Sequence, residues 1–192
     1  MNISLKINML QQAAARNRLK SFVRSCINNE YELTNVKSEF IRLNNVCKQN
    51  GIHPLFCDGT ERLYKYLMAH NNIKLSNILL GELGKIYARS GNIHLAEGAL
   101  SKSLEISRSM DDKLHVLARL TDLEFLYKDC GNKKKLYGVL KEKIKYSKEV
   151  IKNYEHYASN FNTLTKTPAT KNSIKIQLAY AYTNLADLLM RK

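Results

Sequence analysis

The chain of 192 residues has no tryptophan, only two prolines and only eight glycines. With so few helix breakers, long stretches run uninterrupted, and the alternation of apolar and polar residues that marks strands is scarce. The apolar fraction is ordinary and a quarter of the residues are charged, which excludes a wholly disordered chain. We therefore expect an all-α protein made of one domain or one short repeat array.

Cysteine is also scarce, and the four thiols form neither a CxxC pair nor a dense disulfide framework. Cys47, His53 and Cys57 could be imagined as zinc ligands, but their spacing fits no usual site and a fourth ligand is missing. We expect reduced, mostly buried thiols, a cytoplasmic location, and no metal or other cofactor.

The motifs of common enzymes are absent. There is no phosphate-binding loop, no GxSxG and no HExxH, and the five histidines are scattered. We expect no catalytic residues and no enzymatic activity.

No apolar run approaches the roughly 18 residues that a membrane-spanning helix needs, so we expect no membrane span. The first acidic residue is Glu30, and Arg16, Lys20 and Arg24 precede it on an amphipathic helical pattern. Such a segment is similar to an organellar transit peptide, and we interpret it instead as a basic helix that caps the protein. An organelle, or secretion by a non-classical route, is the alternative location.

Acidic residues are few beside basic ones, and the formal net charge is +14. A field of this sign attracts nucleic acid, acidic proteins or anionic membranes. The alternative is a compositional bias in which lysines solvate the surfaces of helices.

One pattern stands out where the chain is most regular. The residues concerned are Leu83, Gly84, Tyr87, Gly91, Ala96 and Leu100. Forty residues later Leu123, Tyr127 and Gly131 repeat part of it, and forty residues earlier Leu43, Cys47 and Gly51 do the same. Gly84 would let the next helix approach closely at Ala96. Gly91 would end the first helix in the left-handed conformation, and Asn92 would cap the next.

This pattern resembles the tetratricopeptide repeat, whose usual length is about 34 residues. The repeats here are longer by about one and a half helical turns. Glu124 stands where the third copy should have glycine, which predicts a wider helix crossing there. The resemblance implies an all-α, right-handed helical-repeat solenoid of about eight antiparallel helices.

The resemblance also implies a division of the single domain 1–192. The predicted parts are a basic N-terminal cap over 1–30, three helix pairs over 31–158, a loop over 159–172 and a capping helix over 173–192. The third pair ends in a long helix, about 133–157. The terminal helix has no second helix after it, so an apolar edge at Leu185, Leu188 and Leu189 is covered by the preceding helix or by another copy. A homo-oligomer is therefore an open alternative.

In the tetratricopeptide family, partner segments bind a groove lined by the first helix of each pair. The family's register implies these groove residues: Glu82, Lys85, Arg89, Thr121, Asp122, Phe125, Lys128, Gln177, Tyr180 and Asn184. The lysine of the family's carboxylate clamp is replaced by Gly81 and Thr121, while Phe125 and Tyr180 could anchor a partner. The predicted function is a protein-protein interaction adaptor or regulator, with chaperone-like roles compatible, that binds a partner with an acidic segment.

The alternative function is a nucleic-acid-associated regulatory protein. Its basic residues would be Lys133, Lys134, Lys135, Lys141, Lys145, Lys148 and Lys152, with Arg16, Lys20 and Arg24. Three lysines begin a predicted helix, where the helix dipole disfavours cations and a bound anion would compensate. Tyr146, Tyr154 and Tyr157 are interleaved with the later lysines and could stack on bases. An ordinary solvated helix face is the competing interpretation.

Overall fold

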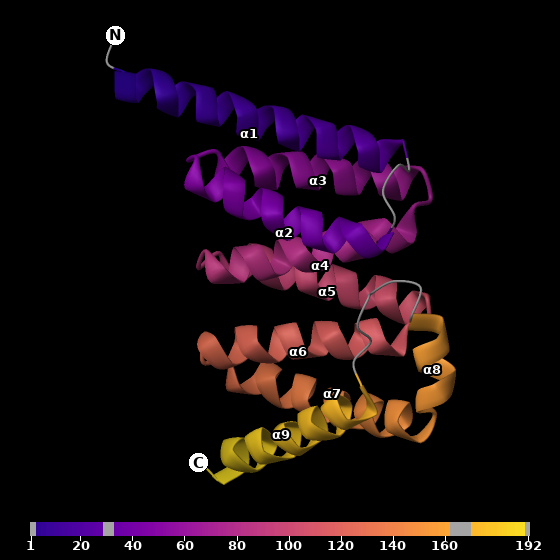
Figure 1. Cartoon of the computed structure of the whole chain (residues 1–192). Helices are drawn as coiled ribbons and strands as arrows, with labels where there is room; N and C mark the ends of the chain where they lie inside the picture. The colour runs from indigo at the N-terminus through magenta and orange to yellow at the C-terminus, as the bar shows by residue number, and fades with distance from the viewer. Residues whose placement is uncertain (1–2, 29–32, 162–169, 191–192) are drawn as a thin grey trace. The chain divides into compact units, whose positions relative to one another are not determined.

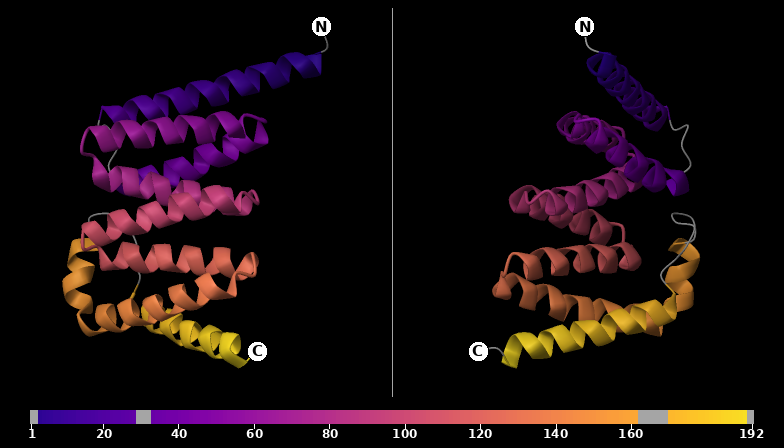
Figure 2. Two further views of the ribbon diagram at one scale, coloured as in Figure 1. Left: turned by 180° about the vertical axis from the view of Figure 1, so that it is seen from behind. Right: turned by 60° about the vertical axis from the view of Figure 1, so that its left-hand side comes forward.

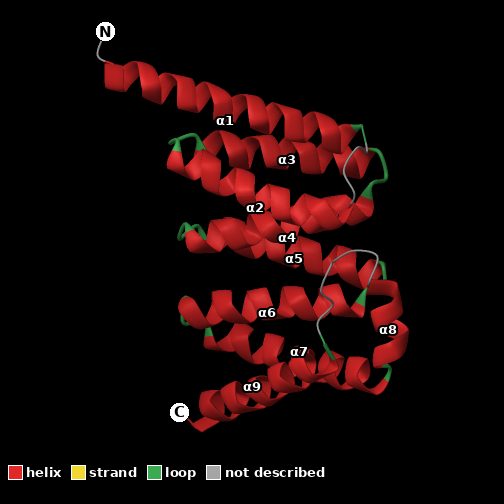
Figure 3. Cartoon of the chain, viewed as in Figure 1, coloured by secondary structure: helices red, strands yellow, loops and turns green. Residues whose placement is uncertain are grey.

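A computed structural model of the chain describes residues 3–28, 33–161 and 170–190. These residues are helical apart from short turns, and no strand occurs among them (Figure 3). The prediction of an all-α protein is therefore confirmed. The chain divides into two compact units, Met1–Leu83 and Gly84–Lys192, and each is described by itself.

The first unit contains α1 (Ile3–Ile27), α2 (Leu33–Gln49), α3 (His53–Ala69) and the first part of α4 (Ile73–Arg89). Helix α1 packs against both α2 and α3, and α2 packs against α3 (Figure 1). Three phenylalanines join these helices. The ring of Phe40 lies 6.3 Å from that of Phe22 and 4.8 Å from that of Phe56, measured between centroids.

The second unit contains the rest of α4, then α5 (Ile93–Ser109), α6 (Lys113–Asp129), α7 (Lys133–Lys152), α8 (Tyr154–Phe161) and α9 (Lys171–Met190). Packing follows chain order, because α5 packs on α6, α6 on α7, and α7 on α9 (Figures 1 and 2). The short helix α8 contacts α6 and α7. Helices that neighbour each other along the chain therefore pack as neighbours, as expected.

The helices from α2 to α7 begin every 20 residues, and the turns between them share one geometry. One residue in each turn has a positive φ: Gly51, Asn71, Gly91, Asp111 and Gly131. At the turn after α4, the Asn92 N–H donates to the Tyr87 carbonyl at 2.9 Å, and the Gly91 N–H donates to the Ala88 carbonyl at 3.0 Å. This pair of bonds is a Schellman motif, and it recurs at the other four turns. The forty-residue step in the sequence is therefore two steps of one helix each.

The two predicted local contacts at the best-matched copy have different outcomes. A Cβ on Gly84 would lie 2.7 Å from the Leu100 side chain, so the close approach is confirmed, although its partner is Leu100 rather than Ala96. The predicted cap by Asn92 is wrong, since that side chain makes no cap hydrogen bond. Asp112 and Asn132 cap the next two helices instead, because their side chains reach backbone N–H groups three residues ahead.

The predicted long helix over 133–157 is wrong, because it is two helices. Helix α7 ends at Lys152, Asn153 caps it by donating to the Glu149 carbonyl at 3.1 Å, and α8 begins at Tyr154. This break raises the number of helices among the described residues to nine, where about eight were expected. The predicted loop over 159–172 lies largely outside the described residues.

Candidate binding surface between α6 and α9

Two opposite charges are buried where α6 packs on α7. Glu124 is 5% exposed and Lys143 is 3% exposed, and the Lys143 Nζ donates to Glu124 Oε2 at 2.6 Å. Steps of 20 residues place Lys143 in a column of buried positions that is otherwise leucine or serine: Leu43, Leu63, Leu83, Ser103 and Leu123. Glu124, which replaces a repeat glycine, is therefore accommodated as one half of an ion pair.

Helix α9 completes this buried group. The side-chain amide of Asn184 donates to Glu124 Oε1 at 2.6 Å, so both carboxylate oxygens are engaged. The Ser147 hydroxyl lies one helical turn after Lys143 and is buried, with no hydrogen-bond partner among the described residues. The carboxylate of Glu124 thus joins three helices, and it fixes the side of α9 that lies next to α6.

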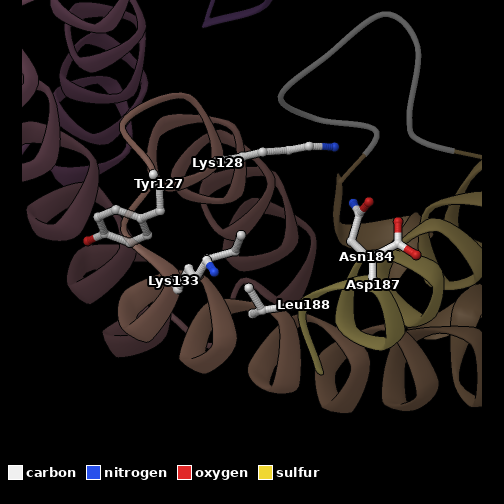
Figure 4. A pocket seen from close by; sticks show the side chains of 8 residues that line it. Tyr127, Lys128, Lys133, Asn184, Asp187 and Leu188 are labelled. Atoms are coloured by element: carbon white, nitrogen blue, oxygen red, sulfur yellow. The ribbon is translucent and has the colours of Figure 1, made fainter. Parts of the chain in front are cut away.

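A hollow of about 230 Å³ lies beside this group, between the end of α6, the start of α7 and α9. Its lining residues are Tyr127, Lys128, Gly131, Lys133, Leu136, Asn184, Asp187 and Leu188. Figure 4 shows Lys128 and Lys133 on the side of α6 and α7, with Asn184, Asp187 and Leu188 on α9. The hollow therefore combines apolar walls with two cations and one carboxylate.

Helices α6 and α9 run side by side in the same direction. Glu124 meets Asn184, and three to four residues further along both helices Lys128 shares the hollow with Asp187 and Leu188. Phe125 lies three residues before Lys128, and Tyr180 lies four residues before Asn184, so each aromatic shares a helix face with a hollow residue. Phe125 is 62% exposed and Tyr180 is 65% exposed.

We call this region the α6–α9 surface, defined by Thr121, Asp122, Phe125, Lys128, Gln177, Tyr180 and Asn184. All seven were predicted from the repeat register, and the structure places them on two adjacent helices. Asp122 is half-buried and its carboxylate lies 3.4 Å from the Arg119 guanidinium, so its charge is engaged within α6. Register reasoning missed Asp187 and the buried pair of Glu124 and Lys143. Lys143 could have been found by comparing positions 20 residues apart, and Asp187 follows only from how α9 packs.

The three predicted groove residues on α4 are placed differently. Glu82 is buried, Lys85 is half-buried, and Arg89 is exposed at the end of the helix. None of them lines the hollow. They are therefore not included in the α6–α9 surface.

The predicted lysine cluster and stripe of α7 are exposed, but several of the lysines have partners. Lys135 pairs with Glu97, and this hydrogen bond lowers the pKa of the Glu97 carboxyl. Lys141 and Lys148 lie over tyrosine rings, at 5.4 Å and 5.5 Å from the centroids. Within the described part of the chain, Lys134, Lys145 and Lys152 have no carboxylate partner.

The tyrosines interleaved with this stripe face the interior. Tyr146, Tyr154 and Tyr157 pack against the buried cluster that contains Leu114 and Val150. Their rings are therefore occupied by core packing, which leaves phosphate contacts from lysines as the basis of the nucleic-acid alternative.

The basic residues of α1 lie in the first unit. Arg16, Lys20 and Arg24 are exposed at four-residue intervals along one face. Lys20 and Arg24 line a second hollow, of about 490 Å³, between α1 and α3. Its one carboxylate, Asp58, is paired with Arg62 at 3.1 Å.

The described residues hold no group of three His, Cys, Asp or Glu side chains that could bind a metal ion. His53 instead hydrogen-bonds Asn44 at 3.0 Å. The cysteines are free: Cys26 and Cys47 are buried, Cys57 is half-buried, and Cys130 is exposed, against the expectation of burial for most. Burial raises the pKa of the Cys26 thiol to about 12. No described helix combines the length and apolar character that crossing a membrane requires.

A comparison with protein-family models, curated proteins and solved structures finds no match to this chain. The resemblance to the tetratricopeptide repeat therefore rests on the spacing of residues and helices alone.

Proposed function

We propose that this protein is a protein-binding adaptor or regulator that holds a segment of its partner on the α6–α9 surface. The observation that carries the proposal is the pair of exposed aromatics, Phe125 and Tyr180, on two adjacent helices beside a hollow. Aromatic side chains supply a large share of interface energy, because they bury much area with few rotatable bonds.

The proposal includes the finer architecture, a right-handed tetratricopeptide-like solenoid. Two observations support it. Helices and turns recur every 20 residues from α2 to α7. In the second unit, α9 packs on α7 as α6 packs on α5, which is where the first helix of a further pair would lie. In that arrangement α6 and α9 are two consecutive first helices, the helices that line the groove of such arrays.

The chemistry of the surface indicates the kind of segment that it would bind. Lys128 and Lys133 reach the hollow from one side, and the protein as a whole carries a net charge of +14. An acidic side chain of the partner would be attracted into the hollow, while apolar side chains next to it would cover Phe125 and Tyr180. We therefore propose a partner segment that alternates acidic with apolar residues.

The test compares three full-length baits in a lysate of the source organism, each with and without nuclease. They are the wild type, a Phe125→Ala/Tyr180→Ala double variant, and a Tyr137→Ala control, which removes an exposed tyrosine of α7. A protein partner should survive nuclease, persist with the control and be lost from the double variant. In titrations of that partner, each alanine should weaken binding about tenfold or more. An identical set of captured proteins with the double variant would contradict the proposal.

The second candidate is nucleic-acid association through α7, favoured by the exposed and unpaired Lys134, Lys145 and Lys152. It requires capture that disappears with nuclease and an affinity that falls steeply with salt, because phosphate contacts release counterions. Charge reversal at these three lysines should abolish such binding. The Phe125→Ala/Tyr180→Ala variant should leave it unchanged.

A further inference from the structure

Helix α9 has one side that no described element of its unit covers. It packs on α7 with Ile174, Ala181 and the half-buried Leu178, Leu185 and Leu188 (Figures 1 and 2). Since successive residues turn by about 100°, the opposite side is formed by other positions. These exposed positions are Ile176, Ala179, Thr183, Ala186 and Met190.

The composition of α9 is that of a covered helix. Its charged residues are Lys171, Lys175 and Asp187 alone, although a quarter of the whole chain is charged. A helix that is apolar all round is normally buried, because an apolar outward side gains nothing from water. The notebook of exposed apolar side chains on α9 also includes Leu189 at the edge where an uncovered surface was expected, whereas Leu185 and Leu188 lie half-buried.

The charges of the outward side are arranged symmetrically about Ala181. Lys175 lies six residues before it and Asp187 six residues after it, on opposite flanks of the outward side. If two copies of α9 meet antiparallel with a two-fold axis at the level of Ala181, each Lys175 faces the Asp187 of the other copy. In the same pairing Ala179 faces Thr183 and Ile176 faces Ala186, so small residues at the centre permit close approach.

We propose that α9 pairs antiparallel with α9 of a second copy of this chain. The charge pattern favours a copy over an acidic partner, because the outward side carries no cluster of cations and its charges complement themselves. The contact is isologous, as in most homodimers. One helix from each copy makes a smaller contact than the roughly 800 Å² per partner of a standard interface, so the expected dissociation constant lies in the micromolar range. This pairing is independent of the partner segment proposed for the α6–α9 surface.

The test measures self-association by analytical ultracentrifugation of the full-length wild type, Lys175→Asp, Asp187→Lys, and an equal mixture of the two variants. Each single variant places like charges opposite each other twice in the homodimer, so its self-association should weaken about tenfold. In the mixture, a heterodimer of the two variants restores opposite charges at both contacts. The mixture should therefore dimerise about as tightly as the wild type.

A Lys141→Asp variant is the matched control, because it makes the same charge change on the exposed face of α7 and should leave dimerisation unchanged. Circular dichroism of every variant checks that the helices are retained. A wild-type chain that stays monomeric at near-millimolar concentration overturns the proposal. So does a mixture that associates no more tightly than its two components.

Discussion

At the scale of single residues, the buried pair of Glu124 and Lys143 is the most consequential departure from the repeat. A lysine occupies a position that leucine fills in most other helices, and its charge is matched by a carboxylate that Asn184 also contacts. Such a pair adds little net stability, since the cost of removing two charges from water offsets their attraction. Its structural effect is to make only one placement of α9 beside α6 and α7 satisfy all three polar groups.

Breaking the pair should be costly. In Lys143→Met the Glu124 carboxylate stays buried without its cation, so we expect a loss of about 3–5 kcal/mol in the free energy of unfolding, measured by urea titration. The control is Lys145→Met, which removes an exposed lysine of the same helix and should change that free energy by less than about 0.5 kcal/mol.

Replacing the whole polar group should recover what the single change loses. In Glu124→Met/Lys143→Met/Asn184→Leu no charge remains buried, so the variant should be close to the wild type in stability or above it. A triple variant less stable than Lys143→Met would show that packing, rather than the unpaired carboxylate, explains the loss.

Asp112 gives the protein a predictable response to acid. Burial acts to raise the pKa of its carboxyl, but hydrogen bonds from the side chain and backbone of His115, with the attraction of its charge, outweigh burial and hold the pKa below the ordinary 3.8. A carboxyl with a lowered pKa in the folded state contributes stability that is complete above 3.8 and is lost as pH falls through the folded value.

The wild type should therefore lose more unfolding free energy than Asp112→Asn between about pH 5 and about pH 2. Asparagine is the informative substitution because its side-chain oxygen can still accept the cap hydrogen bond from the His115 N–H. Urea titrations at a series of pH values measure the difference. Parallel curves for the two proteins would contradict the assignment.

At the scale of elements, the turns decide where each helix stops. Gly91, with φ of +75°, and Asp111, with φ of +53°, occupy equivalent places, so the same left-handed turn is built with and without glycine. Aspartate and asparagine tolerate this conformation better than most side chains do. The turn geometry, rather than the glycine itself, is what repeats.

Two glycines around α5 should respond to alanine in opposite directions. Gly91→Ala forces a side chain into the left-handed region and should destabilise the protein by about 1 kcal/mol. Gly98→Ala meets no atom within 4 Å inside a helix and should stabilise it by roughly 0.5–1 kcal/mol. Thermal or urea unfolding of both variants measures the contrast, and equal effects would contradict it.

Sequence spacing predicted the helix pairs and the turn glycines well, because Gly91 and Gly131 recur with the leucine and tyrosine before them. It did not reveal the half-length step, since Asn71 and Asp111 replace glycine in alternate turns. The stop at Asn153 was missed for a similar reason, as no proline or glycine marks it. Local patterns expose elements whose ends carry a rare residue, and they miss ends formed by ordinary polar ones.

At the scale of the molecule, the net charge of +14 must act on stability as well as on binding. Like charges repel within the folded chain, and salt screens that repulsion over distances of about 10 Å at 0.1 M. The thermal midpoint should therefore rise when sodium chloride is increased from low to physiological concentration. A midpoint that falls with salt would mean that the ion pairs described above outweigh the repulsion among unpaired lysines.

The site was predictable only as far as one helix predicts itself. The register indicated Phe125 and Tyr180, and both are exposed on adjacent helices. The contact of Lys143 with Glu124 joins residues 19 apart, and that of Asn184 with Glu124 joins residues 60 apart, so neither follows from local spacing. The hollow and its carboxylate, Asp187, depend on those contacts.

The uniform length of helix plus turn constrains how such a chain can change over evolutionary time. Deleting or duplicating one helix with its turn would exchange the roles of first and second helices in everything that follows. Deleting or duplicating two together would preserve every later contact surface. Natural relatives of different length should accordingly differ by whole helix pairs, about 40 residues at a time, with the unpaired α9 retained at the end.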